Sequence, residues 1–286
     1  MRLFQKIITI LGTLLVIIGI VIVVVAVSCG GHLLEQEEDN KNFTTVSMED
    51  LESTNKISSI RVDGESDKVQ FEYGDEFKVV ADKVDKDKFK VANENGTLVV
   101  EDKTRNGHKF LGMDITFFNF HFNNKAAKIV ITIPKDFVSD TTEIHLNAGE
   151  VSGESLQTNH LILKLNAGSI DLDQLVVKED GKITVNGGSI DMDDFNGNNM
   201  DIALNAGSVE VSGKFSGNNR VECNAGSAEL NVNGSYDDYY FKYDVSAGNV
   251  EIDGESYHKD GKINSDKKDG FDLDCSVGSI DVDFDH

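Results

Sequence analysis

Hydrophobic and polar residues alternate along most of the chain after residue 43, in short runs and without the period of an α-helix. The alternation is most regular from residue 144 onward, where apolar residues recur at every second position on either side of a small tripeptide. Alternation with a period of two is typical of strands that bury one face. The pattern therefore predicts an all-β chain built of many short strands.

The tripeptide Asn-Ala-Gly, or a close variant of it, recurs along this part of the chain. Successive copies start 19, 20, 19, 19, 22 and 30 residues apart. Their first residues are Asn147, Asn166, Asn186, Asn205, Asn224, Ser246 and Ser276. The positions one and three residues before each copy are apolar, and so are nearly all the matching positions after it. Each copy therefore marks the junction of two half-buried strands.

The apolar phase shifts across the tripeptide, and a strand changes faces only at a corner or a bulge. Gly gives that corner its backbone freedom, and the Asn side chains are placed to stack as an amide ladder. A unit of this size cannot bury its own apolar face, whereas stacked units can. We predict a β-solenoid, or β-helix-like, repeat domain of ~20-residue coils, with about seven coils over residues 136–286. A β-sandwich of equally spaced hairpins is the alternative.

Residues 43–135 show less regular alternation, which predicts an irregular β N-terminal part that caps the coils. Turn sequences such as Asp63-Gly64 and Asn95-Gly96 separate its runs. The strands expected there span residues 56–62, 69–73, 77–81, 88–92, 97–101, 115–122 and 128–133.

Cys223 and Cys275 occupy the same column of the repeat, one residue before the corner. If the coils stack in the order of the sequence, these residues lie two coils apart, which is roughly 9–10 Å. That separation exceeds the reach of a disulfide. We therefore expect two buried free thiols.

Two features of the sequence are similar to those of a known family. One is the strand Ile129–Ile133 followed by Pro134, and the other is the repeat, for example Asn-Ala-Gly-Ser-Ile-Asp-Leu-Asp at residues 166–173. Over residues 45–286 the chain resembles the bacterial "putative adhesin" β-strand-repeat family, whose function is unknown. The resemblance implies an extracytoplasmic, envelope-associated protein, in some relatives near cell-envelope stress systems. It supplies no catalytic residues. The last two corners, at Ser246 and Ser276, depart from the Asn pattern.

The N-terminus contains 21 uncharged residues, Ile7–Val27. As a helix they span roughly 31 Å, enough to cross a bilayer core. Arg2 and Lys6 precede this segment, and the next charged residues are acidic. Because positive charge stays inside, we predict a single-pass anchor within residues 1–29, a polar linker over 30–42, and the bulk of the chain on the extracytoplasmic side of the cell membrane.

Two other fates of this segment stay open. Ala26-Val27-Ser28-Cys29 followed by Gly30 is similar to a bacterial lipoprotein box, so Cys29 is a candidate site of lipid attachment. A cleaved signal peptide with plain secretion is the other, although signal peptides have shorter apolar segments. All three outcomes place the rest of the chain outside the cytoplasm.

Charge narrows the range of partners. The 286 residues include 27 Lys and Arg against 50 Asp and Glu, which gives a formal net charge of −23. Nucleic acid is excluded as a partner, because binding phosphates needs an excess of Lys and Arg. The chain contains 26 Gly and a single Pro, which excludes collagen and Pro-rich stalks and suits short strands joined by tight turns.

Acidic residues form columns in the strand that follows each corner. Stacked coils place such like charges about 4.8 Å apart on one face. A solvated face that prevents aggregation is one interpretation, and a surface for a cationic peptide, an envelope protein or a cell-wall component is another. We expect no cofactor, and calcium is the one candidate, because hard cations need several carboxylate oxygens. The weak metal-site candidates are Asp171, Asp173, Asp191, Asp193, Asp281 and Asp283.

Phe118, Phe120 and Phe122 lie on one face of a predicted strand. They either pack as the cap that a solenoid needs at its open end or form an exposed aromatic patch for a partner.

Catalytic signatures are missing from the sequence. The seven His are scattered, and no G-x-S-x-G, nucleotide-binding loop or paired Cys motif occurs. We therefore predict a membrane-anchored, non-catalytic interaction or scaffold protein of the cell surface. A sensor whose acidic face binds cations or cationic peptides is the alternative, and a polysaccharide-active enzyme is a third hypothesis.

Overall fold

The computed structural model describes residues 43–49, 51–52, 55–103, 109–110, 113–114 and 127–284. The predicted anchor, Cys29, the linker and the three phenylalanines Phe118, Phe120 and Phe122 lie outside these residues. None of the described segments is a helix long and apolar enough to cross a membrane. Contacts divide the chain into two compact units. Of the smaller unit the structure describes the antiparallel pair β6 (Lys109–Phe110) and β7 (Met113–Asp114).

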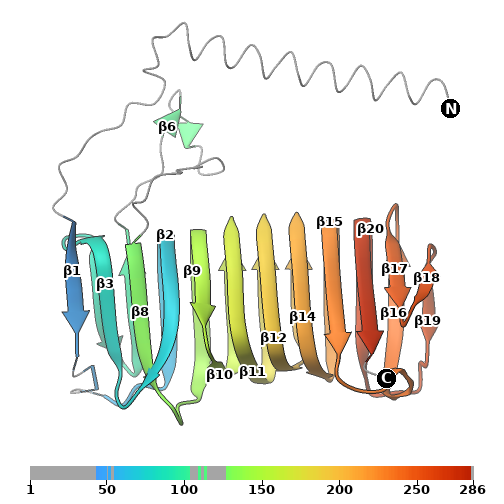
Figure 1. The fold of residues 1–286 in the computed structure, drawn as a ribbon, viewed down its shortest axis with the longest axis horizontal. Coiled ribbons are helices and arrows are strands. Elements are labelled where there is room, and N and C mark those ends of the chain that lie inside the picture. The colour runs from blue at the N-terminus through green and yellow to red at the C-terminus, as the bar shows by residue number, and fades with distance from the viewer. Residues whose placement is uncertain are drawn as a thin grey trace, which may run out of the picture. The chain divides into compact units, whose positions relative to one another are not determined.

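The larger unit is made almost entirely of strands, as the alternation predicts (Figure 1). Its first half contains β1 (Phe43–Met48), β2 (Ser59–Gly74), β3 (Lys78–Asp85), β4 (Phe89–Glu94), β5 (Thr97–Asp102), β8 (Ala127–Pro134), β9 (Ser139–Gly153) and β10 (Leu156–Leu165). Its second half contains β11 (Gly168–Val185), β12 (Gly188–Asn198), β13 (Met200–Leu204), β14 (Gly207–Ser216), β15 (Asn218–Val232), a 3-10 helix (Tyr236–Asp238), β16 (Tyr239–Val245), β17 (Asn249–Ile252), β18 (Glu255–Tyr257), β19 (Gly261–Ile263) and β20 (Asp269–Phe284).

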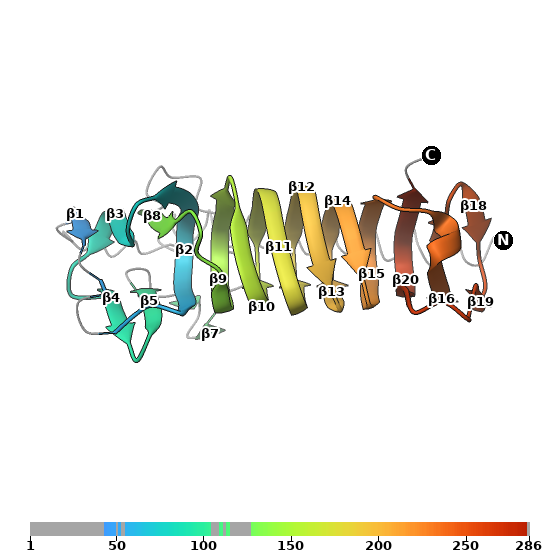
Figure 2. The ribbon, with the colours of Figure 1, turned by 90° about the horizontal axis from the view of Figure 1, so that it is seen from below.

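From β9 to β15 the chain winds as parallel coils, each stacked in register on the one before (Figure 2). We call the strand segments before the Asn-Ala-Gly corners the first wall and those after them the second wall. The first wall contains residues 142–146, 161–165, 181–185, 200–204 and 219–223. The second wall contains residues 149–153, 168–172, 188–192, 207–211 and 226–230. The solenoid-like architecture predicted from the repeat is thus confirmed.

Each tripeptide forms a corner between the two walls. Gly188 has a φ of 142°, and a Cβ there would lie 1.9 Å from the carbonyl oxygen of Gly168 in the coil below. The corner therefore needs Gly, both for its backbone conformation and for the close approach of neighbouring coils. The Asn side chains form the predicted amide ladder, since Asn166, Asn186, Asn205 and Asn224 each donate to the preceding Asn over 2.6 to 2.8 Å.

Apolar columns from both walls meet inside the coils and form one continuous core. A third side closes each coil through residues such as Leu156, Leu175 and Phe195, which are in register with one another. The rings of Phe195 and Phe215 lie 4.8 Å apart, and those of Phe215 and Phe271 lie 5.3 Å apart. Tilted rings in contact thus fill the interior of the later coils.

The N-terminal part extends both walls. β2 bends through a corner of its own, pairing with the first wall at Ile60–Gly64 and with the second wall at Ser66–Phe71. Beyond β2, the first wall continues into β5 and β4, and the second wall continues into β8, β3 and β1. β2 therefore adds one layer to both walls, which the weak alternation of its sequence does not reveal.

The C-terminal end departs from the order of the sequence. β20 pairs in parallel with β15 on one side and with β16 and β17 on the other (Figure 1). The expectation that Cys223 and Cys275 lie two coils apart is therefore wrong, because they are direct register partners on β15 and β20. The expectation of two buried free thiols is confirmed. The order of the sequence did not predict the order of stacking here, because every coil presents the same columns of residues and can pair with any other coil.

Candidate interaction face

The second wall carries an unbroken column of carboxylates, which we call the acidic ladder. One residue per coil contributes, and the parallel register places each directly over the next. In spatial order its members are Asp171, Asp191, Glu210, Glu229, Asp281 and Glu251. Because β20 is inserted ahead of β17, Asp281 lies between Glu229 and Glu251. Neighbouring coils are about 4.8 Å apart, so the ladder holds like charges at a short and constant spacing.

Basic side chains do not neutralise the ladder. No ion pair among the described parts of the chain includes one of its members. The basic residues of the first wall pair instead with acids of that same wall: Lys182 with Asp201, and Lys242 with Asp272 at 2.7 Å. The second wall has an ion pair at its N-terminal end, between Lys68 and Glu150 at 2.7 Å, but none of the described ion pairs includes a member of the ladder.

Asp281 is the most perturbed carboxyl group of the ladder. Burial raises its pKa to about 6, and the charges of Asp283, Glu251 and Glu229 act in the same direction. Its Oδ1 is buried without a hydrogen-bond partner. A carboxylate flanked above and below by other carboxylates takes up a proton more readily than a solvated one. At neutral pH the end of the ladder near β17 therefore carries crowded negative charge.

The other predicted acids lie two positions further along the same strands. Asp173, Asp193 and Asp283 are exposed, and Asp283 has Asn231 as its register partner in the neighbouring coil. The second column is thus broken by polar uncharged residues. Within the part of the chain that the structure describes, no group of three or more His, Cys, Asp or Glu residues is arranged to hold a metal ion. The geometry thus gives the candidate calcium site no support.

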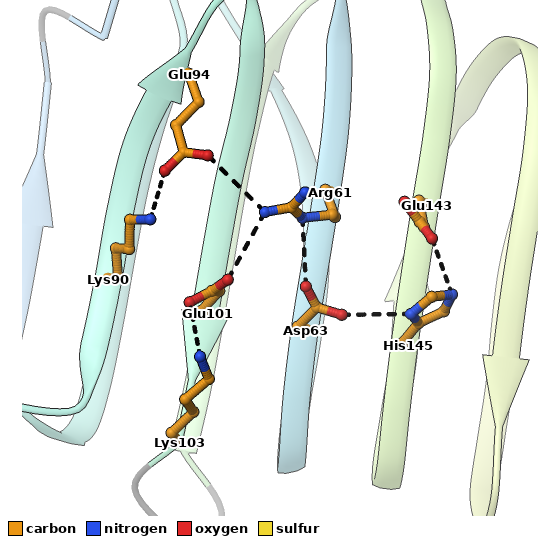
Figure 3. Close-up of polar contacts among 8 residues, drawn as sticks. All are labelled: Arg61, Asp63, Lys90, Glu94, Glu101, Lys103, Glu143 and His145. Atoms are coloured by element: carbon orange, nitrogen blue, oxygen red, sulfur yellow. Dashed lines mark hydrogen bonds and ion pairs between the residues drawn. The ribbon is translucent and has the colours of Figure 1, made fainter.

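A second charged cluster lies at the N-terminal end of the first wall (Figure 3). Its strands were expected from the sequence, but its residues were not among the candidate site residues. The guanidinium of Arg61 on β2 faces three carboxylates: Asp63 at 3.4 Å, Glu101 at 3.7 Å and Glu94 at 3.9 Å. Lys90 pairs with Glu94 within β4. The contacts of Arg61 with Glu101 on β5 and Glu94 on β4 join different strands, and such cross-strand pairs of opposite charge stabilise a sheet.

His145 on β9 extends this cluster toward the coils. Its Nδ1 lies 3.3 Å from Asp63, and its Nε2 lies 3.2 Å from Glu143, so a carboxylate faces each ring nitrogen (Figure 3). The outward positions of β2 and β9 carry these residues in register, Asp63 opposite His145 and Arg61 opposite Glu143. In the sequence, this cluster is visible only as charged residues at alternate positions of two separate strands. Which of these charges face each other becomes clear only from the register of β2 and β9.

Residues 57–282 match the family model described as Toastrack DUF4097. The chain belongs to this family. The resemblance to an adhesin-like family of unknown function, inferred from the repeat, is thereby confirmed.

Several solved structures are similar to the Toastrack chain in fold. A putative cell adhesion protein from Clostridium sporogenes is 12% identical, covers 85% of this chain and 100% of its own, and has a TM-score of 0.35. Putative adhesins from Bacteroides fragilis and Parabacteroides distasonis are 15% and 14% identical, each covering 85% of this chain and 97% and 98% of their own, with TM-scores of 0.40 and 0.37. Among curated proteins, none matches this chain.

A hollow of about 260 Å³ opens beside His145 in the Toastrack domain. Three carboxylates are among the residues that line it: Asp63, Glu65 and Asp102. A glycosidase needs a carboxylic acid that is free to protonate the leaving group. Here Asp63 forms ion pairs with Arg61 and His145, and Glu65 accepts a 2.7 Å hydrogen bond from Asn147. These two carboxylates are occupied in supporting the walls, which favours a structural role over catalysis.

Proposed function

We propose that this chain is a membrane-anchored, extracytoplasmic, non-catalytic interaction module that uses its second wall to bind cationic partners. The observation that carries the proposal is the acidic ladder, whose six carboxylates lie in register and form no ion pairs within the described residues. Arrays of like charge cost stability, and the one ion pair of this wall described between β2 and β9, Lys68 with Glu150, does not involve the ladder. A partner that supplies positive charge at intervals along the ladder would relieve that repulsion.

The anchor is part of the same proposal. The apolar segment at residues 7–27, the basic residues before it and the acidic residues after it support an ectodomain outside the cell membrane. In that setting the ladder would meet cationic peptides, envelope proteins or charged cell-wall components. The family's association with adhesion supports an interaction role of this kind, with cell-envelope stress as one setting.

Binding of a cationic peptide to the full-length protein in detergent micelles tests the proposal. A fluorescent oligolysine is titrated by anisotropy against wild type and against the triple variant Asp171→Asn, Asp191→Asn, Glu210→Gln. The matched control, Asp237→Asn, Asp238→Asn, Glu255→Gln, removes the same charge from exposed positions outside the ladder.

The ladder variant is expected to lose about tenfold in affinity at low salt, and the control less than about twofold, because a regular array focuses the field more than scattered charges do. An equal loss in both variants would mean that net charge alone attracts the peptide. Absence of binding to wild type would overturn the proposal.

Binding of calcium or another divalent cation is the second candidate function. It rests on the crowding of negative charge at Asp281, between Glu229 and Glu251, and not on a preformed set of three or more ligands, of which the described residues contain none. Millimolar calcium is then expected to raise the melting temperature of wild type but not of Asp281→Asn. An unchanged melting temperature of wild type would exclude this alternative.

A further inference from the structure

The C-terminal strand β20 fills a slot whose two sides are formed by residues that precede it in the chain (Figure 1). One side is β15, paired with β20 from Asn218 opposite Gly270 to Val232 opposite Phe284. The other side is β16 and β17, paired with β20 from Tyr239 opposite Asp269 to Ile252 opposite Val282. The last strand that the structure describes is therefore a central strand of both walls.

The far side of the slot has contacts of its own besides its pairing with β20. β17 and β18 form a hairpin, which is enclosed in the chain by the antiparallel pair β16 and β19. Two tyrosine hydroxyl groups also connect the cap to the coils across the slot. Tyr239 donates to the carbonyl oxygen of Phe215 over 2.9 Å, and Tyr240 donates to Oδ1 of Asn218 over 3.0 Å. These contacts involve no part of β20 and are available to the slot whichever copy supplies the strand.

The connection that brings β20 back into the slot is short and turns tightly. It spans residues 264–268, of which all but Asn264 are exposed. Asn264 has a φ of 50°, in the left-handed region that Asn tolerates, and Lys267 donates its backbone N–H to the carbonyl oxygen of Asn264 over 3.1 Å. Short hinges of this kind favour exchange of the element that follows them between copies of a protein.

We propose that β20 is an exchangeable strand through which two copies of this chain associate, each placing its β20 in the slot of the other. The second copy is the occupant that the slot selects, since the buried side chains of β20, among them Phe271, Leu273 and Ile280, make the same contacts in either arrangement. Both ladders of β20 are retained on exchange, while the tight turn at Asn264 is released. An empty slot would leave two long strand edges open, which favours filling it from another copy over leaving it vacant.

The buried cysteines report on the exchange, because Cys223 is on β15 and Cys275 is its register partner on β20. Two differently tagged full-length chains are expressed together, both with Cys29→Ser. One also carries Cys275→Ala and the other Cys223→Ala. After oxidation with copper phenanthroline, a disulfide between the two tags forms only where β20 of one copy lies against β15 of the other. A chain that keeps both Cys223 and Cys275, the calibrating chain, is oxidised in parallel and shows whether these buried, slowly reacting thiols cross-link internally under the same conditions.

Changing the hinge separates exchange from other association. Deletion of residues 265–267 leaves too few residues for β20 to return to its own slot, because the ends of β19 and β20 are separated by the width of two strand spacings, about 9.6 Å, and by an offset along the strands. Insertion of Gly-Ser-Gly-Ser after Lys267 relaxes the hinge. The mixed-tag disulfide is expected to rise several-fold with the deletion and to fall with the insertion.

The proposal is overturned if the calibrating chain cross-links and no mixed-tag disulfide forms, even with the hinge shortened. It is also overturned if the mixed-tag disulfide forms equally with both hinges. If the calibrating chain does not cross-link, co-purification of the two tags is measured instead. The proposal is overturned if chains with the shortened hinge do not co-purify. It is supported if they co-purify more than chains with the lengthened hinge.

Discussion

Cys223 on β15 and Cys275 on β20 are register partners on adjacent parallel strands, although the whole cap from β16 to β19 lies between them in the sequence. Both thiols are fully buried. Their proximity shows that the C-terminal strand has entered the stack ahead of the cap that precedes it. The pair is therefore the most direct chemical marker of the order in which the last coils stack.

Burial first, and the neighbouring Cys275 second, raise the pKa of the Cys223 thiol to about 11. At pH 8 the thiolate, which is the reactive form, is then about a hundredfold scarcer than for a free cysteine. In a Cys29→Ser background we expect the native protein to leave a disulfide reagent such as Ellman's reagent almost unreacted, and the unfolded protein to react at two thiols. Rapid labelling of the native protein would contradict the buried placement of this pair.

Gly188→Ala and Gly187→Ala test the corner at adjacent positions. An added Cβ at Gly188 would meet a backbone oxygen at 1.9 Å in a left-handed conformation, whereas at Gly187 the nearest heavy atom is 3.7 Å away. We expect Gly188→Ala to lower the free energy of unfolding by about 3 kcal/mol or more, because the clash is with backbone. Gly187→Ala should be near neutral, and other copies carry Ala at this position. Urea unfolding of both variants gives the comparison, and similar losses would argue against this corner geometry.

Asn186 lies in the middle of the amide ladder. It donates to Oδ1 of Asn166 over 2.7 Å and accepts from Asn205 over 2.6 Å. Asn186→Ala removes both hydrogen bonds, and we expect a loss of about 1–2 kcal/mol in the free energy of unfolding. Asn233→Ala, at an exposed position beyond the ladder, is the control and should change stability by less than about 0.5 kcal/mol. A larger effect at Asn233 than at Asn186 would remove the amide ladder as a source of stability.

Asp281 gives the protein a pH dependence of definite sign. Its folded pKa of about 6 lies above the ordinary value of 3.8, so the native state binds more protons than the unfolded state between these two pH values. The stability that the protonated form provides is therefore complete below pH ~4 and is lost as the pH rises through about 6. After allowance for solvent screening, the difference amounts to about 1 kcal/mol.

Asp281→Asn should therefore be more stable than wild type at pH 7 by about 1 kcal/mol and should match it near pH 4. Urea unfolding at both pH values measures this. Asp173→Asn, at an exposed position of the same wall, is the matched control and should show a smaller gain at pH 7. If both variants behave alike, the burial of Asp281 and its crowding by neighbouring carboxylates do not raise its pKa in the folded protein.

Local sequence was enough to predict the coil itself. The spacing of the Asn-Ala-Gly copies, the apolar columns and the phase shift at each corner together predict parallel stacking, the amide ladder and a regular column of acids. Each of these depends on residues within one coil and its repeat. Asn186, Gly188 and Asp191 therefore occupy the places that the pattern predicts.

Two features depended on tertiary structure alone. The cluster of Arg61, Asp63 and His145 brings together charges from strands far apart in the sequence, and their alternation carries no sign of which strands pair. The insertion of β20 between β15 and β16 was equally hidden. Each coil offers its neighbours the same apolar, Gly and acidic columns. The repeat therefore specifies the conformation of a coil but not which coil is its neighbour. Only the connections and caps at the ends, which differ from coil to coil, decided which coil lies next to which.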